Sequence, residues 1–156
     1  TNWFGLSCDR KDRYIAGMSM GGYGAIRNGL KHHDTFGYIG AISAAMLTDD
    51  LHNWGEGDDL LSSRSFAQSC FGDLNKVIGS DMDPKFLIDD LIANDIEIPK
   101  IFMAVGDNDF LYDENIDYYN YLKSRNVDVE FRCSSGEHTW EFCNDYIKEF
   151  IEWLPL

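Results

Sequence analysis

Hydrophobic residues alternate along the chain between short, continuous apolar runs and longer stretches in which apolar positions recur every three or four residues. The short runs predict strands, and the stretches with helical spacing predict helices. The predicted strands cover residues 13–16, 38–43, 100–105 and 127–133, and the predicted helices cover 21–31, 65–71, 84–94, 114–125 and 140–154. Because strands and helices alternate, we expect an α/β fold whose mostly parallel sheet carries helices on both faces.

Two segments depart from this alternation. Residues 1–12 are expected to form the end of a helix and a charged turn, with Trp3, Phe4 and Leu6 as apolar contacts. Residues 46–98 are more polar and hold two of the predicted helices. An excursion of this kind between strands often builds a lid or a pocket wall in α/β enzymes, and the alternative is an ordinary crossover with no role in substrate choice.

A serine between two glycines stands where the first predicted strand gives way to the first predicted helix. Gly17 and Gly21 flank Ser19 in a G-x-S-x-G pattern, which is typical of a nucleophile elbow. Such a turn strains the serine backbone, and we expect only glycine-sized neighbours to fit beside it. It also directs the backbone N–H of Met20 towards a developing oxyanion. The alternative is a glycine-rich turn without chemistry.

A serine hydroxyl needs a base, and the base needs a third group to fix its tautomer. His138 is the histidine that directly follows a predicted strand near the C-terminus, and functional groups of open parallel sheets gather beyond the carboxyl ends of strands. The other histidines fit this rule poorly: His32, His33 and His52. We therefore expect His138 to be the base, with a structural histidine as the alternative.

The loop after the third predicted strand offers two carboxylates for the orienting acid, Asp107 and Asp109. We prefer Asp109, because Phe110 and Leu111 follow it and can shield it from water, which strengthens an ion pair. The resulting order, serine, then acid, then histidine, is the order of α/β-hydrolases. A calcium loop counted from Asp107 fails, because tyrosines stand where that loop requires glycine and a bidentate glutamate. We expect no metal and no cofactor.

Composition narrows the choice of partners. The net charge of −14 argues against nucleic acid and anionic membrane surfaces and favours a neutral or weakly charged substrate. No apolar run approaches the roughly 18 residues that a membrane span needs. The cysteines show no metal-binding spacing and are expected to be buried free thiols in a reducing, cytoplasmic setting: Cys8, Cys70, Cys133 and Cys143.

Three stretches carry a resemblance to a known family: residues 15–25 around the serine, 106–112 around the acid and 136–140 around the histidine. Together they resemble the esterase D group of α/β-hydrolases, and within it the small bacterial tributyrin and acetyl esterases. The resemblance runs over essentially the whole chain. It implies a serine carboxylesterase that hydrolyses short-chain acyl or acetyl esters through an acyl-enzyme intermediate.

The resemblance also implies roles for individual residues: nucleophile Ser19, acid Asp109, base His138, oxyanion donor Met20 through its backbone N–H, and Trp140 in the acyl or alcohol pocket. Family members have further strands before the elbow strand, and a loop there supplies a second oxyanion donor. We therefore expect residues 1–156 to be the C-terminal portion of one α/β-hydrolase domain. A separate N-terminal half or another chain would complete the sheet. Whether the protein is a homo-oligomer remains open.

Other functions remain open at this point. A thioesterase or S-formylglutathione hydrolase would use the same triad. A feruloyl or acetyl-xylan esterase acting on carbohydrate esters is a further alternative. A binding module that keeps the hydrolase fold without the chemistry is the third.

Overall fold

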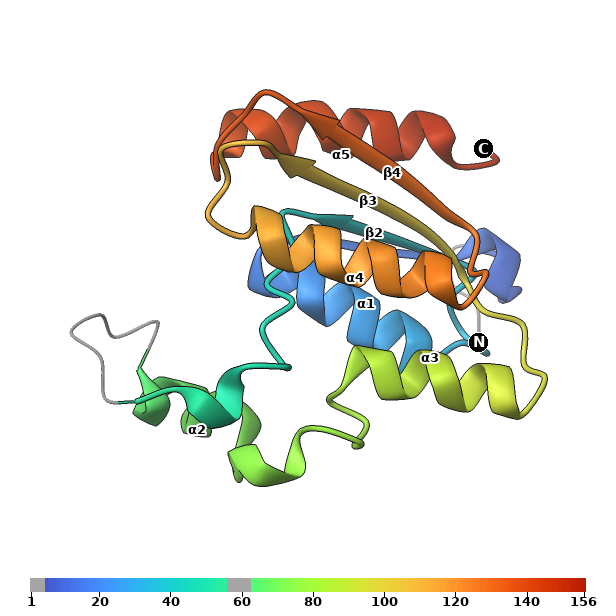
Figure 1. The fold of residues 1–156 in the computed structure, drawn as a ribbon. Coiled ribbons are helices and arrows are strands. Elements are labelled where there is room, and N and C mark those ends of the chain that lie inside the picture. Colours follow the sequence, from blue (N-terminus) through green and yellow to red (C-terminus); the bar gives the residue numbers. More distant parts are fainter. Residues whose placement is uncertain (1–4, 56–62) are drawn as a thin grey trace.

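Four parallel strands form a single sheet with the order β1-β2-β3-β4. The structure is a computed structural model that describes residues 5–55 and 63–156. Its strands are β1 (Tyr14–Met18), β2 (Tyr38–Ile42), β3 (Lys100–Gly106) and β4 (Val129–Ser134). All pairings are parallel, so the carboxyl ends of the strands meet at one edge of the sheet. The loops that follow β3 and β4 lie together at that edge, on the left in Figure 1.

Helices cover both faces of the sheet, as the sequence pattern predicts. They are α1 (Met20–Lys31), α2 (Arg64–Phe71), α3 (Pro84–Ala93), α4 (Tyr112–Ser124) and α5 (Trp140–Trp153). Figure 1 shows α5 on one side of the sheet and α1, α3 and α4 on the other, while α2 lies away from the strands. The chain therefore has the three-layer arrangement of an α/β fold.

The strand register sorts the core into two layers. Ile39 pairs with Ile15 on one side and with Ile101 on the other, so these side chains line up across one face of the sheet. Ile39 and Ile101 are fully buried against α1, α3 and α4. On the opposite face, Phe102 is fully buried against Phe150 of α5. The apolar runs of the strands thus supply both layers.

One edge of the sheet is formed by β1. Within the part of the chain that the structure describes, β1 pairs only with β2. Ala16, at the middle of β1, is exposed, and Ile15 and Met18 are half-buried. Parallel strands are usually buried on both faces, so this edge is unusually open for a strand that leads into a candidate site.

Several element boundaries differ from the sequence prediction by one or two residues. Strand β4 begins at Val129 instead of residue 127, because Asn126 has φ 58° and the Val127 N–H donates to the Leu122 carbonyl (3.0 Å), which ends α4 in a Schellman turn. Helix α4 begins earlier than predicted, directly after the turn at Asp109. Residues 1–4, with Trp3 and Phe4, lie outside the described residues. The expected helix end is not found among residues 5–12, which form a short 3-10 turn at Arg10–Asp12 where the charged turn is expected. Leu6 is 68% exposed.

The cysteines are free, but the expectation that they are buried is wrong. Three are exposed and one is partly buried: Cys8, Cys70, Cys133 and Cys143 in that order. Cys8 precedes the first element, Cys70 lies near the end of the outlying α2, and Cys133 lies on β4 at the sheet edge, so none of these three has a layer packed over it. Burial raises the pKa of the Cys143 thiol.

In residues 5–55 and 63–156, no helix has the length and apolar character to span a membrane.

Tyr23 anchors the helix of the elbow to the excursion. Its hydroxyl donates to the Met82 carbonyl (2.7 Å), and its ring packs edge-on against Phe71, with centroids 5.5 Å apart. Nearby, Asp81 pairs with Arg27 and with Lys31 on the same helix. Burial raises the pKa of Tyr23 from 10.0 to about 12, because the phenolate would lose its hydration.

We expect the free energy of unfolding to fall as the pH rises from 10.0, the ordinary pKa of tyrosine in the unfolded chain, to about 12, the pKa of Tyr23 in the folded protein. Between these values the unfolded chain loses the Tyr23 proton and the folded protein keeps it, so the stabilisation that is present below pH 10 is lost. Tyr23→Phe removes this contribution and should make the fall shallower, while losing about 1 kcal/mol at neutral pH with the hydrogen bond. Denaturant titrations of both proteins across this pH range measure the difference. Equal slopes would contradict the assignment.

Candidate active site

Ser19 occupies a strained turn between β1 and α1. Its φ and ψ are 56° and −123°, a conformation that residues with a side chain rarely adopt. Three backbone hydrogen bonds hold it: the Ser19 N–H donates to the Ile42 carbonyl (3.0 Å), and the Ser19 carbonyl accepts from Tyr23 (3.1 Å) and Ala45 (2.9 Å). The segment that follows β2 therefore fixes the turn from the side of the sheet.

The two glycines of the motif have different reasons to be glycine. A Cβ on Gly17 would stand 2.3 Å from the Gly21 carbonyl oxygen, so the first turn of α1 passes where a side chain would be. A Cβ on Gly21 would meet no described atom within 4 Å. Gly22, which follows the motif, is packed more tightly than Gly21, since its Cβ would lie 2.9 Å from the Ala44 Cβ. The expectation that both neighbours of the serine must be glycine-sized is therefore wrong for Gly21 among the described contacts.

Met20 is the first residue of α1. The first backbone N–H groups of a helix lack acceptors within the helix and point outward along its axis, where they carry partial positive charge. The Met20 N–H thus lies beside Ser19 with the properties of an anion-binding donor. The Met20 side chain is 41% exposed.

His138 and Asp109 meet at the carboxyl edge of the sheet. The ring nitrogen Nδ1 of His138 lies 3.0 and 2.9 Å from the two carboxylate oxygens of Asp109. The Asp109 side chain is fully buried, and that of His138 is 18% exposed. Because a carboxylate only accepts, Nδ1 carries the hydrogen, which leaves Nε2 as the acceptor on the far side of the ring.

The Asp109 carboxylate has a second donor, the Leu111 N–H at 2.8 Å. Leu111 is buried, which agrees with the expectation that it shields the acid from water. Phe110 behaves differently from the expectation, since it is 73% exposed and its ring lies against the imidazole of His138, with centroids 4.6 Å apart. The aromatic ring therefore packs on the base and not on the acid.

Asp107, the other carboxylate of the loop, is exposed and faces different partners. It accepts from the Gly136 N–H (3.2 Å) and from the side chain of Asn108 (2.7 Å). A Cβ on Gly106 would lie 2.3 Å from the Gly136 carbonyl oxygen. The loops after β3 and β4 thus touch through their backbones, and this contact brings His138 over Asp109.

Ser19 shares the sheet edge with this pair but not a hydrogen bond. Among the residues that the structure describes, no hydrogen bond joins Ser19 to His138. In many enzymes without substrate, the bond between nucleophile and base is long and tightens in the complex. The structure therefore brings together two of the three predicted site residues, and it puts the third at the end of a strand in the same sheet.

Trp140 follows two residues after His138, at the start of α5, and is 74% exposed. Together with Phe110 and Met20 it gives the edge three large apolar side chains that face solvent. Such side chains on a carboxyl edge are suited to contact a small apolar group.

Asn115 on α4 is a residue of this region that sequence reasoning missed. It is fully buried, and its side-chain amide bonds to both backbone groups of Ala44 and to the Leu111 carbonyl. A signal was available in the sequence, because Asn115 shares the helical spacing of Leu111, Tyr118 and Leu122, all of which are buried. A polar amide in such an apolar stripe is unusual.

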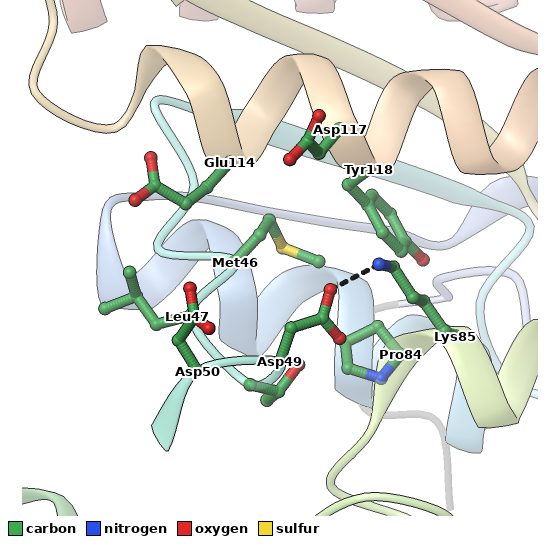
Figure 2. A pocket seen from close by; sticks show the side chains of 10 residues that line it. Met46, Leu47, Asp49, Asp50, Pro84, Lys85, Glu114, Asp117 and Tyr118 are labelled. Carbon is green, nitrogen blue, oxygen red and sulfur yellow. Dashed lines mark hydrogen bonds and ion pairs between the residues drawn. The ribbon is translucent and has the colours of Figure 1, made fainter. Parts of the chain in front are cut away.

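A hollow lies between the segment after β2 and helices α3 and α4 (Figure 2). The Lys85 ammonium pairs with Asp49 across it, and Glu114 and Asp117 present further carboxylates from α4. Within residues 5–55 and 63–156, the Tyr118 hydroxyl and one Glu114 oxygen are buried without a hydrogen-bond partner. Residues of the excursion thus form one wall of an acidic hollow.

Comparison with known families identifies the family to which the chain belongs. The family described as "Putative esterase" matches residues 5–154. The chain belongs to the Esterase family. This Esterase-family chain is 40% identical over 152 residues to an acetyl esterase of Caldicellulosiruptor saccharolyticus, a match that covers 97% of the chain and 57% of that relative.

Solved structures agree in fold. The Esterase-family chain superposes on the S-formylglutathione hydrolase of Staphylococcus aureus with a TM-score of 0.81 and 36% identity, over 97% of the chain and 57% of that protein. It matches the fluorophosphonate-binding serine hydrolase F of Staphylococcus aureus, solved with substrate bound, with a TM-score of 0.82, 36% identity and the same coverage. The chain thus spans about 57% of the length of these relatives, and its fold is that of part of an α/β-hydrolase.

We expect Gly17→Ala to destabilise the Esterase-family chain by about 1 to 3 kcal/mol, because the new methyl group must displace the backbone of Gly21. Gly24→Ala on the same helix is the matched control. Its Cβ would meet one atom at 4.0 Å, and alanine favours the helix by up to about 1 kcal/mol. Denaturant unfolding of both variants measures the contrast. A Gly17→Ala variant as stable as Gly24→Ala would disprove the tight elbow.

Proposed function

We propose that the protein is a serine carboxylesterase that hydrolyses short-chain acyl or acetyl esters through an acyl-enzyme intermediate. In this proposal Ser19 is the nucleophile, His138 the general base and Asp109 the acid that orients it. The observation that carries the proposal is the buried contact between Asp109 and the Nδ1 of His138, at the sheet edge where the strained Ser19 turn ends a parallel strand. Membership of the Esterase family supports it.

The proposed reaction follows from which ring nitrogen of His138 is free to accept a proton. Asp109 holds the Nδ1 hydrogen, so Nε2 of His138 accepts the proton of the Ser19 hydroxyl. The Ser19 oxygen attacks the ester carbonyl, and the negative charge that develops on the carbonyl oxygen is stabilised by the backbone N–H of Met20. His138 then donates the proton to the departing alcohol. Water, activated by the same imidazole, hydrolyses the acyl-enzyme.

Small, uncharged acyl esters suit the surroundings of these residues. The net charge of −14 disfavours anionic substrates in the approach to the site. Trp140 and Phe110 are exposed beside His138 and offer apolar surface to an acyl or alcohol group. We propose Trp140 as a substrate contact on this ground. The acetyl esterase relative at 40% identity supports the choice of substrate class.

A thioester is the second candidate substrate, and the S-formylglutathione hydrolase at 36% identity favours it. The same nucleophile and base would act on it, since a thiolate is a better leaving group than an alkoxide. Glutathione carries carboxylates, which the acidic chain would attract less than a neutral ester. Parallel assays of an acetyl ester and of S-formylglutathione separate the two.

We also propose that the open edge of β1 is covered in the active protein, by another segment of the polypeptide or by a second chain. The exposed Ala16 and the half-buried Ile15 support this, because parallel strands are normally covered on both faces.

We propose that residues 46–98 act as a pocket wall. The four free cysteines support a reducing, cytoplasmic setting.

The first test replaces the nucleophile. In the natural full-length protein, Ser19→Ala should abolish hydrolysis of p-nitrophenyl esters and labelling by a fluorophosphonate probe, since both reactions need the hydroxyl. A panel of esters of increasing acyl length, run on the unaltered protein, should show the highest kcat/KM for the shortest chains. Residual labelling of the alanine variant would mean that another residue is the nucleophile.

The second test separates the two carboxylates. Asp109→Asn should lower kcat by roughly 10⁴-fold, because an amide no longer fixes the tautomer of the base. Asp107→Asn should change kcat by no more than about twofold, since the amide oxygen still accepts from the Gly136 N–H and the residue is exposed. Steady-state kinetics on p-nitrophenyl acetate measures both. Equal losses would show that the acid has been assigned wrongly.

A further inference from the structure

The side chain of Asn115 makes three hydrogen bonds in a fully buried position. Its Oδ1 accepts from the Ala44 N–H at 3.2 Å, and its Nδ2 donates to the Ala44 carbonyl at 2.8 Å and to the Leu111 carbonyl at 2.7 Å. One primary amide therefore satisfies both backbone groups of Ala44, which is itself fully buried. An apolar residue of the same size would leave the Ala44 N–H without this partner, while the Ala44 carbonyl would keep only its bond from the Met46 N–H (2.9 Å).

One arm of this arrangement leads to the nucleophile. Ala45, the next residue after Ala44, donates its N–H to the Ser19 carbonyl at 2.9 Å. Ala44 also lies against Gly22 in the first turn of α1, where a Cβ would come within 2.9 Å. A shift of Ala44 therefore moves the backbone that holds the strained conformation of Ser19.

The other arm leads to the acid. Leu111, whose carbonyl accepts from Asn115, donates its own N–H to the Asp109 carboxylate at 2.8 Å. Asp109 in turn holds the Nδ1 of His138. Asn115 thus bonds to Leu111, whose N–H binds the acid. It also bonds to Ala44, whose neighbour Ala45 binds the Ser19 carbonyl.

We propose that Asn115 is a positioning residue that keeps the Ser19 turn and the Asp109 turn at a fixed distance for catalysis. The inference rests on the proposed function of Ser19, His138 and Asp109. It goes beyond that function, because in the part of the chain that the structure describes Asn115 forms no hydrogen bond with these three side chains and acts through backbone groups of Ala44 and Leu111. Its effect falls on the geometry of the catalytic groups and not on substrate binding.

The experiment uses Asn115→Leu in the natural full-length protein, with p-nitrophenyl acetate as substrate. Leucine fills the space and removes all three hydrogen bonds. We expect kcat and the rate of fluorophosphonate labelling of Ser19 to fall by about 10- to 100-fold, the effect of a displacement of catalytic groups by about 1 Å. KM should stay within about twofold of the unaltered protein. Asn115→Ser, which leaves room for a water to replace the lost bonds, should retain more activity than Asn115→Leu.

A matched control separates positioning from general destabilisation. Leu122→Ala lies two turns further along α4, in the fully buried core away from both turns, and should lower the stability while leaving kcat within about twofold. All variants are assayed at a temperature at which circular dichroism shows them folded. If Asn115→Leu does not fold, Asn115→Ser provides the measurement, with a smaller fall in kcat and the same unchanged KM.

The outcomes distinguish this inference from the proposed function. Wild-type kcat in folded Asn115 variants, together with an inactive Ser19→Ala, overturns the role of Asn115 alone. A fall in kcat of equal size in Leu122→Ala also overturns it, because the loss would then follow stability. An active Ser19→Ala overturns the proposed function and this inference with it. A selective loss of kcat at Asn115 supports the inference.

Discussion

The candidate site depends on how closely backbone segments approach one another at the carboxyl edge of the sheet. The first turn of α1 passes 2.3 Å from where a Gly17 side chain would begin, and the loop after β4 lies equally close to Gly106. Neither approach tolerates a Cβ. Because these contacts are between backbones, the positions of Ser19 and His138 are set by the path of the chain and not by adaptable side-chain packing.

Much of this arrangement follows from sequence patterns. The four apolar runs predict the four strands, and their parallel pairing carries the turns after them to one edge. The pairing of Asp109 with His138 also follows from position, since each residue comes directly after a strand and the two strands are neighbours. The catalytic roles of these residues belong to the proposed function.

Other features were not accessible to sequence patterns, because they depend on tertiary neighbours. The role of Gly21 in the motif suggested a steric need, yet the space beside it is open among the described atoms. The cysteines were expected to be buried by composition, but three occupy outlying or edge segments. Asn115 shares the spacing of the apolar residues of its helix, but only the position of the segment after β2 reveals what its amide binds.

The backbone at Ser19 has an evolutionary consequence. Its φ of 56° and ψ of −123° are values that glycine adopts freely and serine adopts under strain. The fold would therefore become more stable if this residue lost its side chain, while the proposed reaction would lose its nucleophile. Under that proposed role, selection for thermal robustness and selection for activity act in opposite directions at this single codon.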